Sequence, residues 1–313
     1  MSGPPLLSVR GLSVDFALGE ARLRAVDRVS FDLEAGRTLA LVGESGCGKS
    51  TLARAVAGLV PSSEGSVQLR GDELVGLSRR GWRPFRRRVQ MVFQDPDASL
   101  NPRMNAASLI GEPLVVHQRL RGARLDQAVC ELMERVGLDP ALRTRFPHAF
   151  SGGQRQRIGI ARALAVEPEL LLCDEVTSAL DVSIQAQILE LLRGLQDQLG
   201  LGILFITHDL GVVRHLAHDV AVMYLGELVE RAPADRLFAG PSHPYSRLLL
   251  SAVPRVGQHP AAQAGAGEVP SPLAPPSGCR FHPRCVEAVA RCTREVPEAV
   301  EVSEGIVRCL LRG

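Results

Sequence analysis

The chain has 313 residues, which is enough for one large domain or two small ones. Hydrophobic residues make up 45% and charged residues 22%, an ordinary globular balance, and the formal net charge is only +2. So weak a charge gives no support for nucleic-acid binding by the chain as a whole. No apolar run reaches the roughly 18 residues of a membrane span, and Met1–Arg10 is not a secretory signal, so we expect a cytosolic protein that serves a membrane only through partners.

The N-terminal part alternates and turns, which predicts short strands. They are Leu7–Val9, Leu12–Phe16, Val29–Leu33, Thr38–Val42, Ser66–Leu69 and Val89–Phe93, with a helix at Ser50–Leu59. From about residue 95 to 165 the apolar spacing becomes helical. The predicted helices there are Ala106–Val116, Leu125–Val136 and Gly153–Val166.

Two buried strands follow, Leu170–Asp174 and Ile203–Thr207, and each precedes a helix, Ser183–Leu199 and Leu210–Ala217. Strands that alternate with helices predict an α/β fold with a parallel sheet, into which the helical block is inserted. From Pro254 to Gly278 the composition shifts to Pro, Ala, Gly and Gln, which is typical of a linker.

A glycine-rich loop lies between the strand Thr38–Val42 and the following helix. Its residues are Gly43, Glu44, Ser45, Gly46, Cys47, Gly48, Lys49, Ser50 and Thr51. The glycines let backbone N–H groups turn toward phosphate oxygens at a helix N-terminus, which favours anions. Lys49 would supply charge to the β- and γ-phosphates, and Ser50 a hydroxyl for Mg²⁺. The loop predicts a nucleotide site, with Cys47 as a small filling residue.

Acidic residues follow the apolar strand that ends at Asp174. Because adjacent residues point to opposite sides of a strand, Asp174 suits holding Mg²⁺ and Glu175 suits polarising water as a general base. His208 follows the next apolar strand, where a side chain emerges at the carboxyl edge of the sheet and is expected to contact the γ-phosphate.

A second anion-binding helix N-terminus is predicted at Ser151, Gly152, Gly153 and Gln154. Two such sites in one chain are of little use unless the second serves another subunit's nucleotide. The pair resembles the ATP-binding-cassette (ABC) family. The resemblance implies two domains that meet head to tail, with ATP between the phosphate loop of one and the SGGQ segment of the other.

The remaining motifs of that family occur in order over about residues 5–250. Gln94 looks like the Q-loop glutamine, which touches Mg²⁺ and water, and His208 matches the switch histidine. Phe16 stands where the family keeps an adenine-stacking aromatic, with Phe in place of the usual Tyr. The D-loop that crosses the dimer interface is matched by Ser178, Ala179, Leu180 and Asp181.

The resemblance implies a P-loop NTPase (RecA-like) core with a mostly parallel sheet, an N-terminal antiparallel β subdomain, an inserted helical subdomain and a C-terminal cysteine-rich extension. The expected boundaries are 1–94 and 166–235 for the ATP-binding core and 95–165 for the helical signature subdomain. Residues 236–278 form a strap and linker, and 279–313 a four-cysteine tail.

Three segments resemble the ATPase subunits of dipeptide and oligopeptide importers: Phe93–Arg103, Asp181–Gln187 and His243–Leu249. These importers have two unlike ATPases, and residues 99–103 look more like the second of them. The resemblance implies a heterodimer of ATPases below two permease chains, at the cytoplasmic face of the membrane. An extracytoplasmic solute-binding protein feeds them, and no nucleic acid is expected.

Four cysteines crowd the C-terminus: Cys279, Cys285, Cys292 and Cys309. They look like a C-terminal motif that holds a [4Fe-4S] cluster in some members of the importer subfamily. Zinc and a metal-free tail are the alternatives, and the wide cysteine spacing argues mildly against zinc.

Alternative functions are import of nickel chelates or glutathione-type solutes, export, and a soluble cassette ATPase acting on DNA or ribosomes. The last usually carries two cassettes or a long coiled coil, neither of which this sequence shows. The cargo itself is not readable from these motifs.

Overall fold

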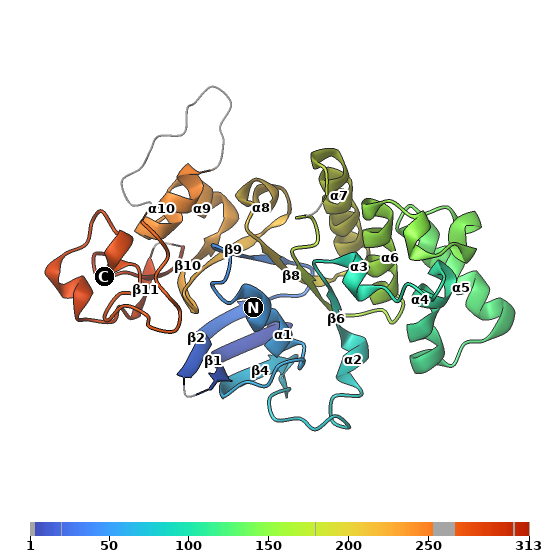
Figure 1. Ribbon diagram of the computed structural model, residues 1–313, viewed down its shortest axis with the longest axis horizontal. Helices are drawn as coiled ribbons and strands as arrows, with labels where there is room; N and C mark the ends of the chain where they lie inside the picture. The colour runs from blue at the N-terminus through green and yellow to red at the C-terminus, as the bar shows by residue number, and fades with distance from the viewer. Residues whose placement is uncertain (1–3, 20, 179, 253–266, 303, 313) are drawn as a thin grey trace. The chain divides into compact units, whose positions relative to one another are not determined.

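The computed structural model describes residues 4–19, 21–178, 180–252, 267–302 and 304–312 (Figure 1). The chain divides into two compact units. The first is drawn from the ranges 1–33, 38–76 and 205–313, and the second from 34–37 and 77–204. Strand β8 (Gly202–Thr207) runs across the division.

The first unit contains an antiparallel sheet with the strand order β2-β1-β4-β5 (Figure 1). The strands are β1 (Leu7–Leu18), β2 (Ala21–Leu33), β4 (Glu64–Leu69) and β5 (Asp72–Glu73). The two strands predicted at the start of the chain are one strand, because Gly11 takes a φ of 55° and carries a register shift between Val9 and Leu12. The predicted antiparallel β subdomain is confirmed.

A second run of strands in the first unit has the order β11-β12-β10-β9-β3. They are β3 (Thr38–Val42), β9 (Asp219–Tyr224), β10 (Glu227–Pro233), β11 (Ala299–Val302) and β12 (Gly305–Arg308). Strand β3 pairs with β9 in parallel, and all five of its residues are buried, as expected for an inner parallel strand. The other pairings in this run are antiparallel. The sequence analysis assigned no strand to β9, β10, β11 or β12.

Short helices complete the first unit. They are α1 (Lys49–Val56), α8 (Leu210–Leu216), α9 (Ala234–Ala239) and α10 (Pro244–Ser251), with 3-10 turns at His282–Arg284 and Ala290–Thr293. Tyr224, Tyr245 and Phe281 are fully or almost fully buried in one apolar cluster. Since Phe281 comes from the C-terminal tail, the tail is part of this unit's core.

The second unit holds the parallel pair β6 (Val89–Val92) and β7 (Leu170–Asp174) and most of the helices. The helices are α2 (Phe85–Arg88), α3 (Pro96–Ser99), α4 (Ala106–Pro113), α5 (Gly122–Arg135), α6 (Gly152–Leu164) and α7 (Val182–Leu199). Two 3-10 turns lie at Pro140–Thr144 and Pro147–Ala149. The predicted helical block between residues 95 and 165 is present.

Two helix ends in the second unit have clear local causes. The helix predicted at Ala106–Val116 ends as an α-helix at Pro113, which has no N–H to donate, and continues as a π-helical turn over Leu114–Gln118. Helix α7 ends where Gly200 takes a left-handed φ of 66°.

The parallel pairs β3/β9 and β6/β7, with helices between successive strands, confirm the predicted α/β class. The antiparallel strands β10, β11 and β12 extend the sheet beyond the parallel pattern. Across the described residues, no helix combines the length and the apolar character that a bilayer crossing requires.

Candidate nucleotide site

Two glycines of the loop that follows β3 lie very close to backbone carbonyl groups from other parts of the chain. A Cβ on Gly43 would lie 2.2 Å from the carbonyl oxygen of Met223, and one on Gly48 would lie 2.1 Å from that of Ala25. Gly48 has a φ of 106°, a conformation that side chains disfavour. The loop path therefore requires glycine at both positions.

Lys49 begins helix α1 and folds back over the loop. Its Nζ donates to the carbonyl oxygens of Gly43 at 2.8 Å and Glu44 at 2.9 Å, and the residue is only 4% exposed. Ser50 and Thr51 follow it in the first turn of α1. The N-cap, Gly48, has no side chain with which to cap this helix.

The middle of the loop is tied to the rest of the first unit. Gly46 has a φ of 78°, and Cys47 is 4% exposed with its carbonyl accepting from the N–H of Gly226 at 2.9 Å. Burial raises the pKa of the Cys47 thiol, so it stays protonated and uncharged. This packing agrees with the prediction that Cys47 is a filling residue and not a reactive thiol.

Two residues that the sequence analysis did not assign to the site contact Glu44. The hydroxyl of Tyr245 accepts from the N–H of Glu44 at 3.0 Å, and the guanidinium of Arg284 binds its carboxylate. Burial raises the pKa of Tyr245, which keeps its proton. The sequence around Tyr245 shows only a family resemblance. No sequence pattern near Tyr245 or Arg284 predicts a contact with the loop.

Two further predicted site residues belong to the first unit. Phe16 lies in β1 and is 36% exposed, so its ring has a free face for stacking. His208 directly follows β8 and is exposed, and the next residue, Asp209, caps helix α8 by accepting from the N–H of Gly211 at 2.8 Å. The placement of His208 after the strand is as predicted.

The second unit holds the acidic pair and the glutamine. Asp174 ends β7 and is 1% exposed, while Glu175 turns out of the strand with a φ of 49°. The amide nitrogen of Gln94, just beyond β6, donates to the carboxylate of Glu175 at 2.9 Å. The structure thus brings together Gln94 and Glu175, which are both among the predicted catalytic residues.

The predicted D-loop lies between β7 and α7. Ser178 donates from its hydroxyl to the carbonyl oxygen of Glu175 at 3.0 Å, and the N–H of Leu180 donates to that of Thr177 at 3.2 Å. Asp181 is exposed at the start of α7, and Ala179 lies outside the described residues. These turns hold the backbone next to the acidic pair.

Side chains of the signature segment cap the N-terminus of α6. The hydroxyl of Ser151 accepts from the N–H of Gln154 at 3.3 Å, and the side-chain oxygen of Gln154 accepts from the N–H of Ser151 at 3.0 Å. This capping box satisfies two end groups reciprocally. A Cβ on Gly153 would lie 2.5 Å from Cγ2 of Ile184, so α7 approaches closely, while Gly152 is partly exposed.

The four tail cysteines are free thiols, with Cys292 buried and the other three half-buried. Burial, with smaller contributions from the neighbouring thiols of Cys292, Cys309 and Cys285, raises the pKa of Cys279 to about 11. They therefore gather in one region. Even so, no three His, Cys, Asp or Glu side chains of the described chain are placed to hold one metal ion together.

Comparisons with known proteins agree with this geometry. Residues 26–178 match the family model described as ABC transporter, and residues 229–292 match the one described as oligopeptide/dipeptide transporter, C-terminal region. The chain resembles the cassette MJ0796, solved as a dimer in a post-hydrolysis state bound to ADP and Pi. The TM-score is 0.68 at 27% identity, over 73% of this chain and 98% of that one.

Curated relatives are closer in sequence. The chain is 51% identical to the probable peptide ABC transporter ATP-binding protein y4tS of Sinorhizobium fredii, over 93% of this chain and 83% of the relative. It is also 51% identical to the di/tripeptide transport ATP-binding protein DppF of Pseudomonas aeruginosa, over 93% of this chain and 91% of the relative. With half of its residues identical over nine-tenths of its length, the chain belongs to the ABC transporter family as one of its ATP-hydrolysing, ATP-binding proteins.

Proposed function

We propose that this chain hydrolyses ATP to drive the import of di- and oligopeptides. One observation carries the cargo class: residues 229–292 match the C-terminal region of oligopeptide/dipeptide transporters, which lies outside the ATP-binding segment at 26–178. The names of the two relatives described above, both peptide transport proteins, support the same class.

The proposed roles of the site residues follow the motifs. The loop Gly43–Thr51 cradles the phosphates with Lys49, and Phe16 stacks on adenine. Mg²⁺, held by Ser50, Gln94 and Asp174, would neutralise charge on the β- and γ-phosphates. Glu175 orients and deprotonates the attacking water, and His208 contacts the γ-phosphate. The hydrogen bond from Gln94 to Glu175 supports a shared task for that pair.

The proposed assembly completes two composite sites. The signature residues Ser151, Gly152, Gly153 and Gln154 cap the ATP of a second, unlike ATPase chain, and the D-loop residues 178–181 cross the interface. Two permease chains and an extracytoplasmic solute-binding protein complete the importer, with this chain peripheral at the cytoplasmic face of the inner membrane. We infer that residues 1–94 and 166–235 form the ATP-binding core and that residues 95–165 form the signature subdomain. Residues 236–278 then form the strap and linker, and residues 279–313 form the four-cysteine tail.

The tail is proposed to hold a [4Fe-4S] cluster through Cys279, Cys285, Cys292 and Cys309. Four cysteine thiolates are the usual ligand set, and neighbouring tail thiols help to raise the pKa of Cys279 and of Cys285. A single zinc ion usually takes cysteines two to four residues apart in sequence, and the wider spacing of these four argues mildly against it. In a [4Fe-4S] cluster each thiolate would bind its own iron. Iron and acid-labile sulfide should be present; one zinc per chain without iron would contradict the proposal.

The cargo is tested on the assembled transporter. Peptide-loaded binding protein should stimulate the ATPase activity of the complex, and the unliganded binding protein should stimulate it less. The permeases that co-purify with the chain provide an independent readout. Stimulation by a nickel chelate or glutathione in place of peptides would overturn the peptide proposal while leaving the ATPase assignment intact.

The role of Glu175 is tested by Glu175→Gln. Loss of a general base is expected to lower turnover by about 100-fold or more while ATP binding remains, which traps a closed dimer. Glu169→Gln is a matched control in the same unit, since the carboxylate of Glu169 pairs with Arg88. Wild-type turnover in Glu175→Gln would contradict the assigned role.

A further inference from the structure

The C-terminal tail reaches the phosphate loop through one side chain. Arg284 ends the 3-10 turn His282–Arg284, and its two terminal nitrogens bind the two carboxylate oxygens of Glu44 at 2.7 and 2.9 Å. Arg284 is only 8% exposed. This paired fork is the strong geometry for arginine and carboxylate, and a buried charge requires such a partner.

An aromatic cluster holds the guanidinium in place. The central carbon of Arg284 lies 5.8 Å from the ring centre of Tyr224 and 5.9 Å from that of Phe281. Tyr245 packs against both rings, at centroid distances of 4.6 and 5.3 Å. Cation–π contact with a buried ring stabilises a charge that burial would otherwise disfavour.

The same cluster fixes the loop backbone. Tyr245 accepts from the N–H of Glu44, and its hydroxyl lies 3.4 Å from one carboxylate oxygen of that residue. Glu44 is therefore held at its backbone by helix α10 and at its side chain by the tail. Contacts from outside the phosphate loop therefore help to fix the position of Glu44, its second residue.

Charge explains why this contact matters. ATP brings several negative charges to the loop Gly43–Thr51, and the carboxylate of Glu44 would repel them at short range if it stood alone. We propose that Arg284 is a positioning residue for ATP binding, which neutralises and orients Glu44 so that the loop accepts the phosphates. This inference rests on the proposed role of the loop as the phosphate site.

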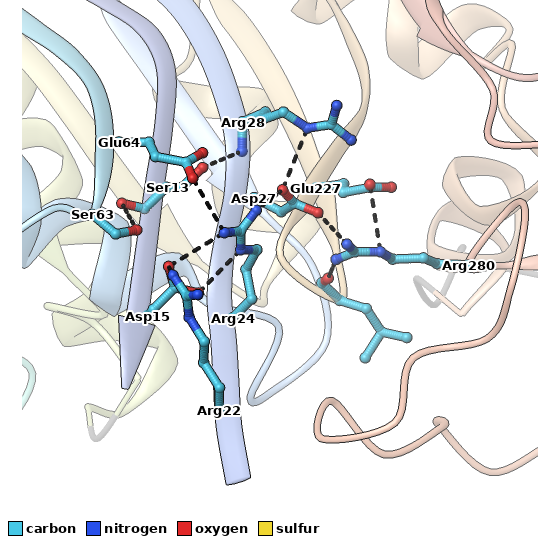
Figure 2. Close-up of polar contacts among 11 residues, drawn as sticks. Ser13, Asp15, Arg22, Arg24, Asp27, Arg28, Ser63, Glu64, Glu227 and Arg280 are labelled. Atoms are coloured by element: carbon cyan, nitrogen blue, oxygen red, sulfur yellow. Dashed lines mark hydrogen bonds and ion pairs between the residues drawn. The ribbon is translucent and has the colours of Figure 1, made fainter. Parts of the chain in front are cut away.

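A second arginine of the tail supplies the matched control. Arg280 donates to the carbonyl oxygen of Leu225. Figure 2 shows it reaching Asp27 and, at 3.4 Å, the carboxylate of Glu227. Its side chain is 15% exposed, against 6% for that of Arg284. Arg280 thus anchors the same tail through a buried ion pair without touching Glu44.

The test uses the full chain for equilibrium ATP binding and the assembled transporter for KM and kcat. Arg284→Gln should raise the Kd and KM for ATP about tenfold and change kcat less than about twofold, because the chemical groups are untouched. Arg284→Lys, which keeps the charge but not the fork, should lose less. Arg280→Gln should lower Tm and leave the KM for ATP within about twofold of wild type.

A second substitution separates charge from folding. Glu44→Gln in the Arg284→Gln background removes the unpaired carboxylate and should recover most of the lost ATP affinity. The inference is overturned if Arg284→Gln leaves KM unchanged, if the double variant binds no better, or if Arg280→Gln raises KM equally. Lys49→Ala tests the underlying site: wild-type ATP binding in that variant would sink the proposed phosphate site, whereas loss of binding there with unaffected Arg284 variants would sink only this inference.

Discussion

The two glycine-rich segments proposed as anion sites differ in the contacts that hold them. The signature turn of the second unit closes its own capping box between Ser151 and Gln154, three residues apart. The phosphate loop of the first unit relies on residues far along the chain, with Met223 crowding Gly43 and Arg284 binding Glu44. A glycine-rich turn at a helix N-terminus can thus be held by its own side chains or by residues distant in sequence. Mutations in the two segments should therefore differ in how much stability they remove.

The largest effect is expected where remote backbone presses on the phosphate loop. Gly43→Ala places a Cβ 2.2 Å from a carbonyl oxygen that cannot turn aside, so the strand or the loop must move. We expect a loss of stability on the order of 4 kcal/mol, measured by chemical denaturation. In Gly46→Ala, no heavy atom of the described residues beyond residues 45–47 lies within 4 Å of the new Cβ. Only the left-handed strain of about 1 kcal/mol should appear there, and equal losses would break the comparison.

The second effect is a loss of stability in acid through His243, the N-cap of the helix α10 that carries Tyr245. His243 caps α10 by accepting from the N–H of Tyr245 at 3.0 Å, and burial, with a smaller contribution from Arg247, lowers its pKa to about 3. Because the unfolded histidine titrates near 6.5, the unfolded chain binds the extra proton between these values. Stability from this group is present above pH 6.5 and is lost as the pH falls, by about 1.4 kcal/mol per pH unit.

The acid effect has a direct control. His243→Asn keeps a side-chain acceptor at the N-cap but cannot titrate, so the variant should lack this part of the pH slope between pH 6.5 and 5. Denaturation midpoints of both proteins across that range measure the difference. Identical slopes would mean that His243 does not enter the acid response.

The smallest effect is expected at the self-contained turn. Ser151→Ala removes the acceptor for the N–H of Gln154 and should cost about 1 kcal/mol, while Ser151→Thr keeps the cap. ATP binding by the single chain should not change in either variant, since the proposed role of the turn is toward a partner's nucleotide. A loss of ATP affinity in the isolated chain would show that the turn serves this chain's own site.

The same contrast explains what the sequence could predict. Buried runs such as Thr38–Val42 and Leu170–Asp174, and the helix that opens after Ser151, are local patterns, and the structure has them where they were expected. The short strands β9 to β12 were missed, although Gly226, with a φ of 88°, marks the turn between β9 and β10. The pairing of Glu44 with Arg284 joins positions that no local rule connects. The roles assigned to the site residues remain predictions.

The link between Arg284 and Glu44 has a consequence for biosynthesis. The two residues are 240 positions apart, so a ribosome adding about 5 to 20 residues per second makes the second roughly 12 to 48 seconds after the first. Throughout that interval the nascent phosphate loop exists without its arginine. A chain released before residue 284 would carry the complete glycine motif and still lack the contact that neutralises Glu44. Full affinity for nucleotide would then be acquired only by the finished polypeptide.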